Sequence, residues 1–255
     1  MNLPHDPFAT DAGEPRRLLG ISLYAAAPAL ADLAGQLGFD VVWMDLEHGP
    51  AGFQQAESAC YAARAAGALP LVRIAEVQRE YVLKALEIGA RIVVAPMVDT
   101  AEQAARLVQY GKFPPLGRRG LNSRTPGNRF GLDGTEQLLA LANDRTRLFA
   151  QIETRAAIEA LPAICRVPGL DGVFFGPSDL SLSYGWPGQL QRPELIELVA
   201  RAARSACAAG KLVGVLAPPG PLLAAAVDAG ARLLIVGGDL GDLTAVWSQR
   251  LRELG

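Results

Sequence analysis

The chain alternates between short apolar runs and longer amphipathic runs. Eight short runs, most of them rich in Val, Ile, Leu and Phe, predict strands at residues 19–23, 41–45, 70–73, 91–94, 147–152, 172–175, 211–216 and 232–236. The runs between them predict helices at residues 27–37, 52–66, 80–88, 100–110, 156–164, 193–208, 221–229 and 240–253. The strands are apolar on both faces, which is typical of a parallel sheet that helices cover.

Eight strand–helix units in a chain of 255 residues indicate a closed (β/α)8 barrel, the TIM barrel. The competing fold is an open doubly wound sheet, which requires a glycine-rich turn after the first strand that residues 20–27 do not supply. A glycine follows the end of several predicted helices, where it suits a left-handed C-cap: Gly38, Gly67, Gly89, Gly210 and Gly230. We expect one barrel domain at residues 16–255, preceded by a flexible N-terminal tail at residues 1–15.

The segment 112–141 interrupts the alternation and is expected to be a long irregular stretch between the fourth helix and the fifth strand. It could fold around the rim of the barrel or reach a neighbouring subunit, so that its arginines meet an anionic substrate. Alternatively, it is a solvated surface loop. The arginines concerned are Arg118, Arg119, Arg124 and Arg129.

Composition narrows the function classes. The formal net charge of −2 argues against nucleic acid or an anionic membrane as the main partner. No apolar run is long enough to span a bilayer, and the acidic, proline-bearing N-terminus does not resemble a secretory signal. Cys60, Cys165 and Cys207 have no Cys-x-x-Cys spacing, which favours reduced thiols and a cytoplasmic protein.

Polar and charged residues follow four of the predicted strands at the point where each strand ends. Since these ends meet at one face of a barrel, their side chains are expected to form a site. They are Asp45, Glu47 and His48 after the second strand, Arg73 after the third, Gln151 and Glu153 at the fifth, and Gly176, Ser178 and Asp179 after the sixth.

The two carboxylates from consecutive strands, Glu153 and Asp179, suit a hard divalent cation such as Mg²⁺ or Mn²⁺. Taken singly, each has another interpretation: Glu153 could cap the helix that follows it, and Asp179 could cap a turn. Their placement beside His48 and Arg73 favours the metal site.

His48 and Arg73 suit different tasks. His48 follows two acids at a strand end, which favours proton transfer, although a lone histidine is more often structural. Arg73 could neutralise a developing oxyanion or pair with Glu47. The turn from Gly176 to Asp179 could offer backbone N–H groups to carboxylate or phosphate oxygens, or be an ordinary strand–helix turn.

Only three lysines occur: Lys84, Lys112 and Lys211. None is predicted to lie where a buried amine could form a Schiff base with a carbonyl substrate. If the barrel makes or breaks carbon–carbon bonds next to a carbonyl, a metal must therefore stabilise the enolate.

The sequence resembles the HpcH/HpaI family of metal-dependent class II pyruvate aldolases, which includes 4-hydroxy-2-oxoheptanedioate aldolase and 2-dehydro-3-deoxyglucarate aldolase. The similarity extends from about Gly20 to Leu243. The matching blocks are Gly-Phe-Asp at 38–40, Asp-Leu-Glu-His-Gly-Pro at 45–50, Pro-Leu-Val-Arg at 70–73, Ala-Pro-Met-Val at 95–98, Pro-Pro-Leu-Gly-Arg-Arg-Gly at 114–120, Gln-Ile-Glu-Thr at 151–154 and Asp-Gly-Val-Phe-Phe-Gly-Pro-Ser-Asp-Leu-Ser at 171–181.

The resemblance implies a barrel of the phosphoenolpyruvate/pyruvate-binding type, usually hexameric, with a divalent ion (Mg²⁺, Mn²⁺ or Co²⁺) held by Glu153 and Asp179. Pyruvate would bind that ion through its keto and carboxylate oxygens. Among the other matched positions, His48 is the base, Arg73 stabilises the transition state and Glu87 is the acid that assists the histidine. The residues that contact the substrate are Gln151, Gly176 and Ser178. Asp45 and Glu47 lie behind these residues and support them.

The implied reaction is reversible retro-aldol cleavage of a 4-hydroxy-2-oxo acid to pyruvate and an aldehyde, through an enolate held by the metal, in aromatic or sugar-acid catabolism. A second enzyme hypothesis is an acyl-CoA lyase similar to the citrate lyase β and malyl-CoA lyase groups, whose nucleotide phosphates the arginine-bearing segment could bind. A third hypothesis is a ligand-binding barrel without catalysis. The retention of Glu153, Asp179, His48 and Arg73 together argues against it.

Overall fold

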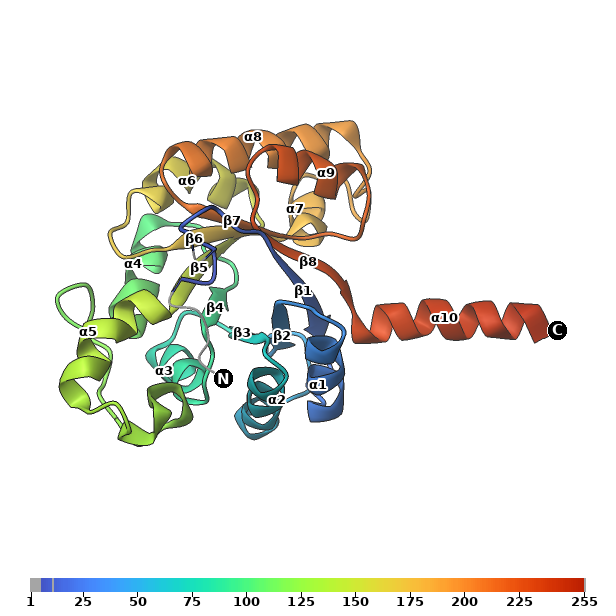
Figure 1. Ribbon diagram of the computed structural model, residues 1–255. Helices are drawn as coiled ribbons and strands as arrows, with labels where there is room; N and C mark the ends of the chain where they lie inside the picture. Colours follow the sequence, from blue (N-terminus) through green and yellow to red (C-terminus); the bar gives the residue numbers. More distant parts are fainter. Residues whose placement is uncertain (1–5, 11, 255) are drawn as a thin grey trace.

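The computed structural model describes residues 6–10 and 12–254, and it forms a closed barrel of eight parallel strands in chain order (Figure 1). Each strand pairs with its sequence neighbours, and β1 also pairs with β8, which closes the barrel and excludes the open doubly wound sheet. The strands are β1 Leu18–Leu23, β2 Val41–Asp45, β3 Leu69–Arg73, β4 Ile92–Ala95, β5 Arg147–Ile152, β6 Gly172–Phe175, β7 Leu212–Leu216 and β8 Leu233–Gly238.

Helices connect the strands and form the outer layer (Figure 1). They are α1 Pro28–Gln36, α2 Phe53–Ala65, α3 Arg79–Glu87, α4 Ala101–Gly111, the 3-10 helix η1 Pro126–Gly131, α5 Thr135–Arg145, α6 Arg155–Cys165, α7 Pro177–Ser183, α8 Pro193–Ala208, α9 Pro221–Asp228 and α10 Asp239–Leu254. The predicted (β/α)8 barrel is confirmed. The five glycines expected at helix ends all have positive φ, as left-handed caps require.

The interior of the barrel is filled by side chains and is not a pore. Trp43 packs edge-on against Phe174 with ring centroids 4.9 Å apart, and Phe149 lies in the same cluster. A second, alanine-rich layer lies between the strands and the helices. The short side chains there let the helices pack closely on the sheet.

Part of the expected N-terminal tail is packed. Phe8 is 3% exposed and lies against Phe149 inside the barrel, with ring centroids 6.2 Å apart. Arg147 also forms an ion pair with Asp6, at 3.3 Å. The prediction of a flexible tail is therefore wrong for the described residues around Phe8, because an aromatic side chain gains by leaving water. The prediction for residues 1–5 and 11 lies outside the described residues.

The segment 112–141 is not irregular throughout, which corrects the prediction. It contains η1 and most of α5, and it lies between α4 and β5. The sequence of α5 has apolar residues at helical spacing, and Leu138 and Ala142 are buried against Phe113. The helical spacing in α5 is therefore visible in the sequence, but it is short. It was missed because a proline- and glycine-rich stretch precedes it.

The last helix, α10, extends away from the barrel and stands apart from it (Figure 1). Of its residues only Asp239, at its start, is buried. Its exposed apolar side chains are Leu240, Leu243, Val246, Trp247, Leu251 and Leu254. Within residues 6–10 and 12–254, none of the helices combines the length and the apolar character needed to cross a membrane.

Candidate active site

Asp45 and Arg73 form the centre of a charged cluster at the carboxyl ends of β2 and β3. They are direct partners across the two strands. The Nε of Arg73 donates to Oδ1 of Asp45 at 2.9 Å, Nη2 donates to the other oxygen, and Nη1 lies 3.0 Å from Oε2 of Glu47. Asp45 is fully buried, and the guanidinium of Arg73 lies over the ring of Trp43 at 5.3 Å. Burial lowers the pKa of Arg73, but the hydrogen bonds and charge of Asp45 outweigh it, so the pKa is raised and the cation persists.

The loop after β2 is held by the same carboxylate. Oδ1 of Asp45 accepts the backbone N–H groups of Glu47 and His48 at 3.1 and 3.3 Å. The imidazole of His48 is 58% exposed, and its Nε2 lies 4.0 Å from Oε2 of Glu47. Burial raises the pKa of Glu47, although Arg73 opposes the shift. His48 is thus oriented by its backbone while its ring remains accessible to a ligand, with Glu47 as the nearest acid recorded for it.

Glu153 lies immediately after β5 and is 2% exposed. Its Oε1 accepts the backbone N–H of Met97 at 2.7 Å, and its Oε2 accepts a hydrogen bond from Nε2 of Gln151. Burial raises the pKa of Glu153, and the charge of Asp179 raises it further. The two carboxylates therefore lie close enough to repel each other.

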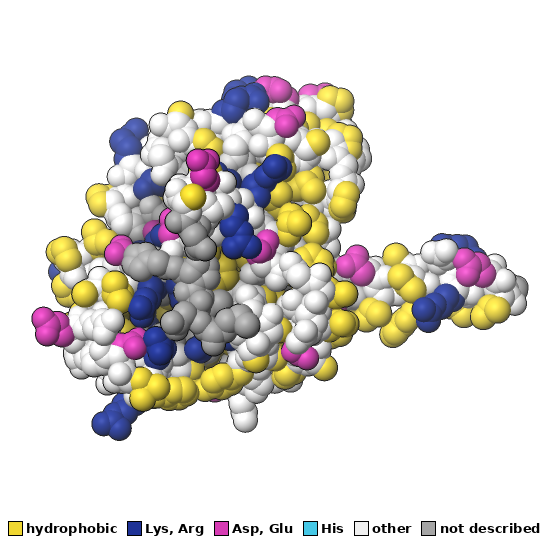
Figure 2. Space-filling view, viewed as in Figure 1, with side chains coloured by type: hydrophobic (Ala, Val, Ile, Leu, Met, Phe, Trp, Pro, Cys, Tyr) yellow, Lys and Arg dark blue, Asp and Glu magenta, His cyan; other side chains and the backbone are white. Residues whose placement is uncertain are grey.

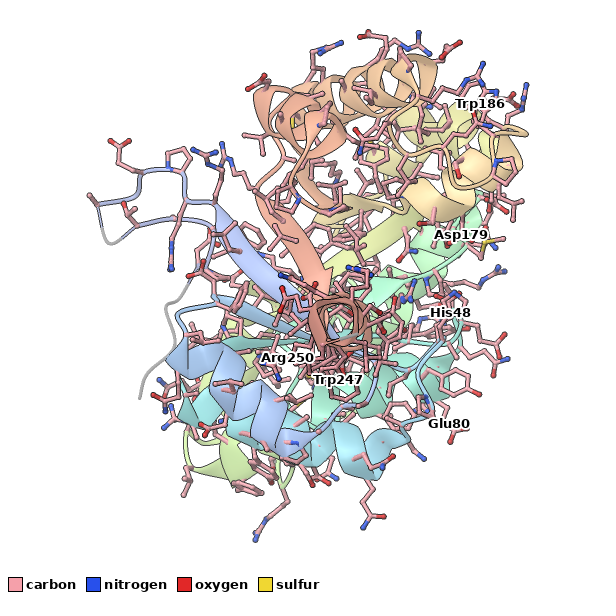
Figure 3. The ribbon with its side chains drawn as sticks, turned by 90° about the vertical axis from the view of Figure 1, so that its right-hand side faces the viewer. His48, Glu80, Asp179, Trp186, Trp247 and Arg250 are labelled. Atoms are coloured by element: carbon pink, nitrogen blue, oxygen red, sulfur yellow. The ribbon has the colours of Figure 1, made fainter. Side chains whose placement is uncertain are left out.

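The alternative role of Glu153 as a helix cap is excluded. The cap of α6 is Thr154, whose side chain accepts the backbone N–H of Ala157 at 3.0 Å. Asp179 lies in the first turn of α7, half-buried, on the same side of the barrel as His48 (Figure 3). Glu153 is therefore not the cap of α6, and no side-chain hydrogen bond among the described residues caps α7.

Gly176 permits the close approach of these groups. A Cβ at this position would lie 2.7 Å from Oε2 of Glu153 and 3.0 Å from Nε2 of Gln151. Its own N–H donates to the carbonyl of Ile152 at 3.3 Å, so the expected free N–H at Gly176 is not available. Pro177 has no N–H, and the N–H of Ser178, in the first turn of α7, has no acceptor within the helix.

The donor set fits a hard divalent cation. No group of three or more His, Cys, Asp or Glu side chains in residues 6–10 and 12–254 is arranged to hold a metal ion. Glu153 and Asp179 nevertheless bring two carboxylates together, and the carbonyl oxygen Oε1 of Gln151 is buried with no hydrogen-bond partner among the described groups. Oxygen donors are the ligands that Mg²⁺ and Mn²⁺ prefer, and such ions keep open positions for water and substrate.

Comparison with known proteins identifies the family of the chain. The family model described as HpcH/HpaI aldolase/citrate lyase matches residues 19–244. The chain belongs to the HpcH/HpaI aldolase/citrate lyase family.

Relatives in this family share nearly the whole chain. A protein named 2-keto-3-deoxy-L-rhamnonate aldolase from Klebsiella pneumoniae subsp. pneumoniae is 34% identical over 247 residues, 96% of this chain and 92% of its own length. A protein named hydroxypyruvate/pyruvate aldolase from Roseobacter denitrificans is 31% identical, over 98% of this chain and 100% of its own. The crystal structure of an HpcH/HpaI aldolase from Desulfitobacterium hafniense has a TM-score of 0.87 at 30% identity and covers 94% of this chain and 93% of that one.

Glu87 does not join the HpcH/HpaI site within the chain, which corrects the expectation that it assists His48. It is the last residue of α3, from which the chain enters the amino end of β4. Its backbone oxygen lies 3.3 Å from where a Cβ of Gly127 would be, and its charge acts on Arg119. The site lies at the carboxyl ends of the strands, so Glu87 is at the opposite end of the barrel.

The three lysines also lie away from the site. Lys84 is exposed on α3. Lys112 is 1% exposed, but its Nζ is held by the carboxylate of Asp171 at 2.9 Å and by two backbone carbonyls. Nζ of Lys211 donates to the carbonyl of Leu170 at 2.7 Å. None of these amines is placed to attack a carbonyl substrate at the catalytic end.

Two residues at the site were not predicted. Met97, after β4, adopts a positive φ of 52° while its N–H donates to Glu153. A residue in that conformation is often part of a functional site. Tyr24 lies on the loop after β1, and burial together with the charge of Asp45 raises the pKa of its hydroxyl, so the group stays a hydrogen-bond donor. For Met97 the available signal was its place in the block Ala-Pro-Met-Val, and for Tyr24 it was the position directly after a strand.

Proposed function

We propose that the chain is a class II aldolase that cleaves a 4-hydroxy-2-oxo acid reversibly to pyruvate and an aldehyde. The observation that carries the proposal is the pair Glu153 and Asp179 beside Arg73 at the carboxyl end of the barrel. The relatives named as aldolases, which share almost the whole chain, support it.

A divalent ion (Mg²⁺, Mn²⁺ or Co²⁺) would be held by Glu153 and Asp179. When bound, it supplies Lewis-acid polarisation of the 2-keto group. The observations that support this are the raised pKa of the Glu153 carboxyl and the unpartnered carbonyl of Gln151. A cation between the carboxylates would remove the repulsion that the protein otherwise retains.

The chain's own residues divide the remaining work. The 2-oxo acid lies with its carboxylate near the N–H of Ser178 and its keto oxygen toward Arg73, with Gln151 beside it. His48 removes the proton from the 4-hydroxyl, the C3–C4 bond breaks, and its electron pair becomes the enolate of pyruvate. Arg73 stabilises the enolate charge while the aldehyde leaves. A proton from solvent then adds to C3 and completes pyruvate, and His48 returns the proton that it removed to solvent.

The acyl-CoA lyase hypothesis is less well supported. A coenzyme A substrate needs basic residues for its nucleotide phosphates near the reacting carbonyl. Arg119 and Arg129 of the segment 112–141 instead line a pocket at the amino ends of the strands, and Arg119 is close to Glu87. Within one chain they cannot reach a thioester at Glu153.

The enzyme is proposed to be a cytoplasmic homo-oligomer, a hexamer by its resemblance to the family, in aromatic or sugar-acid catabolism. The exposed apolar side chains of α10 support an oligomer because they find no cover in their own chain. The outward face of β1 is also incompletely covered, since Leu19 is 46% exposed and Ile21 is half-buried. The α10 helix of a second copy would cover both surfaces.

The test is a pair of assays on one preparation: exchange of the pyruvate methyl protons in deuterated buffer, and cleavage of a panel of 4-hydroxy-2-oxo acids. Both should require a divalent ion and should fail in Glu153→Ala and Asp179→Ala, while Glu159→Ala, which removes an exposed carboxylate on α6, remains active. Near wild-type activity in chelating buffer would contradict the metal. Cleavage of CoA thioesters without exchange would favour the lyase, and no turnover of any kind would favour a binding protein.

A further inference from the structure

A cavity of about 720 Å³ lies at the end of the barrel opposite the catalytic groups. It is bounded by the end of α2, the turn from α3 into β4, η1 and α5. Its lining residues include five arginines: Arg64, Arg91, Arg119, Arg129 and Arg145.

The cationic charge of this cavity is poorly compensated. Asp133 is the one acidic residue among the described lining residues, and it is shared between Arg129 at 3.2 Å and Arg145 at 3.4 Å. Arg64 and Arg91 donate to backbone carbonyls, those of Pro126 at 3.3 Å and Arg145 at 2.5 Å. A neutral carbonyl satisfies a donor but leaves the positive charge in place.

Two of the arginines have buried nitrogen atoms that donate no hydrogen bond to the described groups. Arg119 is 6% exposed, and its Nε has no hydrogen-bond partner among the described groups. The Nη2 of Arg91 is buried and also has no partner in the described part of the chain. Burial lowers the pKa of both guanidinium groups to about 10. The charges of Arg145 and Arg64 add to the shift at Arg91, whereas the charge of Glu87 opposes the shift at Arg119.

An unpaired buried guanidinium costs free energy, and several of them close together cost more, because like charges repel. Such a cluster is expected where a bound anion neutralises the positive charge in the functional protein. Figure 2 shows several Lys or Arg side chains close together at the lower left of its face, the part of the molecule where Figure 1 draws α3 and α5.

We propose that this cavity, lined by Arg64, Arg91, Arg119, Arg129 and Arg145, is a binding site for a small phosphorylated molecule. A phosphate group carries nearly two charges and three terminal oxygens, so it can accept hydrogen bonds from two or three guanidinium groups at once. A single carboxylate would leave most of the donors unused. The volume and the apolar lining residues Tyr61, Leu138 and Ala142 leave room for an organic portion.

The site is separate from the catalytic groups, so the proposal stands or fails independently of the aldolase activity. It also gives the arginine-bearing segment a role that does not require it to reach the catalytic end. Arg119 and Arg129 belong to that segment and line the cavity, whereas Arg124 is exposed and does not line it.

The experiment is isothermal titration calorimetry of the full-length protein with inorganic phosphate, ADP and succinate as probes. We expect phosphate and ADP to bind and succinate, a carboxylate of the same formal charge as phosphate, to bind at least about tenfold more weakly, as about 1.4 kcal/mol less favourable binding would give. Arg64→Gln and Arg91→Gln should each weaken phosphate binding by about tenfold or more, since each removes a charge-assisted hydrogen bond. Arg124→Gln is the matched control and should bind as the wild type does.

Thermal unfolding provides a second measurement that does not depend on heats of metal chelation. Phosphate should raise the melting temperature of the wild type and of Arg124→Gln, but not that of Arg91→Gln. Without phosphate, Arg91→Gln should be at least as stable as the wild type, because it relieves repulsion. Binding that is unchanged in Arg64→Gln and Arg91→Gln, equal binding of succinate, or no binding of any probe at millimolar concentration would each overturn the proposal.

Discussion

At the scale of single residues, the catalytic end combines buried charges that would be costly alone. Asp45 and Arg73 are partners across β2 and β3, and each supplies the counter-charge that the other needs in the absence of water. Glu47 extends the pair toward His48. Glu153 lacks a cation of this kind at hydrogen-bonding distance among the described residues, which leaves its carboxyl available for the proposed metal ion.

Arg73 and His48 should differ in the reactions that they affect. Arg73→Ala should suppress both pyruvate proton exchange and aldol cleavage, because both pass through the enolate whose charge it stabilises. His48→Ala should reduce cleavage by about 10²–10⁴-fold, the usual range for a general base, with a smaller effect on exchange. The measurement is the rate of both reactions on the same variants across pH. Normal cleavage by His48→Ala would show that the histidine is not the base.

Gly176→Ala should impair the metal site without disturbing the barrel. The added methyl group would lie 2.7 Å from a carboxylate oxygen of Glu153 and must displace it. We expect the affinity for Mn²⁺ to fall by about 10–100-fold, as when the support of a metal ligand is lost. Metal titration of activity measures this, and Gly52→Ala, where a Cβ meets nothing within 4 Å, is the control. Equal affinities in both variants would mean that Glu153 is not a ligand.

At the scale of elements, the pattern of the sequence predicted all eight strands and their order, because most strands are short, mainly apolar runs that alternate with amphipathic runs. It also predicted the strand ends at or next to which Asp45, Arg73 and Glu153 lie, whereas Asp179 lies in the first turn of α7. It missed α5 and α7, which are short and lie in polar or proline-rich surroundings. Glu87 lies away from the other site residues of its own chain, because a match to a motif gives only a position in the sequence, whereas the end of the barrel at which a residue lies depends on the direction of its helix.

The apolar pattern of α10 likewise predicts the helix but not its packing partner. Its apolar residues Leu240, Leu243, Trp247, Leu251 and Leu254 recur every three or four positions, which predicts one apolar stripe but cannot choose its partner. The structure excludes packing on its own barrel, since only Asp239 of the helix is buried.

Trp247→Glu should therefore dissociate the oligomer. Trp247 is 57% exposed in the single chain and is the middle one of the five residues of the stripe. Burying a new carboxylate in an apolar interface is strongly unfavourable, so the mass measured by light scattering should fall toward that of the 26.9 kDa chain. Gln249→Glu places the same charge outside the stripe and should leave the mass unchanged. A wild-type monomer at micromolar concentration would contradict the oligomer itself.

At the scale of the whole molecule, the two ends of the barrel have opposite electrostatic character. The catalytic end concentrates carboxylates whose pKa is raised by burial, at Glu47 and Glu153. The opposite end concentrates arginines whose pKa is lowered by burial, at Arg91 and Arg119. Each end is thus expected to gain stability from a ligand of the opposite sign, a cation at one and an anion at the other.

The dependence of stability on pH tests the carboxylate end. A carboxyl whose pKa in the folded protein is raised above its ordinary value of 4.5 favours folding at pH below 4.5, and that contribution is lost as pH rises through the folded-state pKa. The metal-free protein should therefore lose stability from about pH 4.5 upward on account of Glu153. Glu153→Gln removes this loss, so without metal it should melt higher than the wild type at pH 7 and show no such advantage at acidic pH.

Added Mn²⁺ at 100 times its dissociation constant should stabilise the wild type by about 2.7 kcal/mol, and the variant by much less. Calorimetric unfolding of both proteins across pH, with and without the ion, measures all four states. If the variant gains as much from Mn²⁺ as the wild type does, the ion binds elsewhere, and the repulsion between Glu153 and Asp179 must have another function.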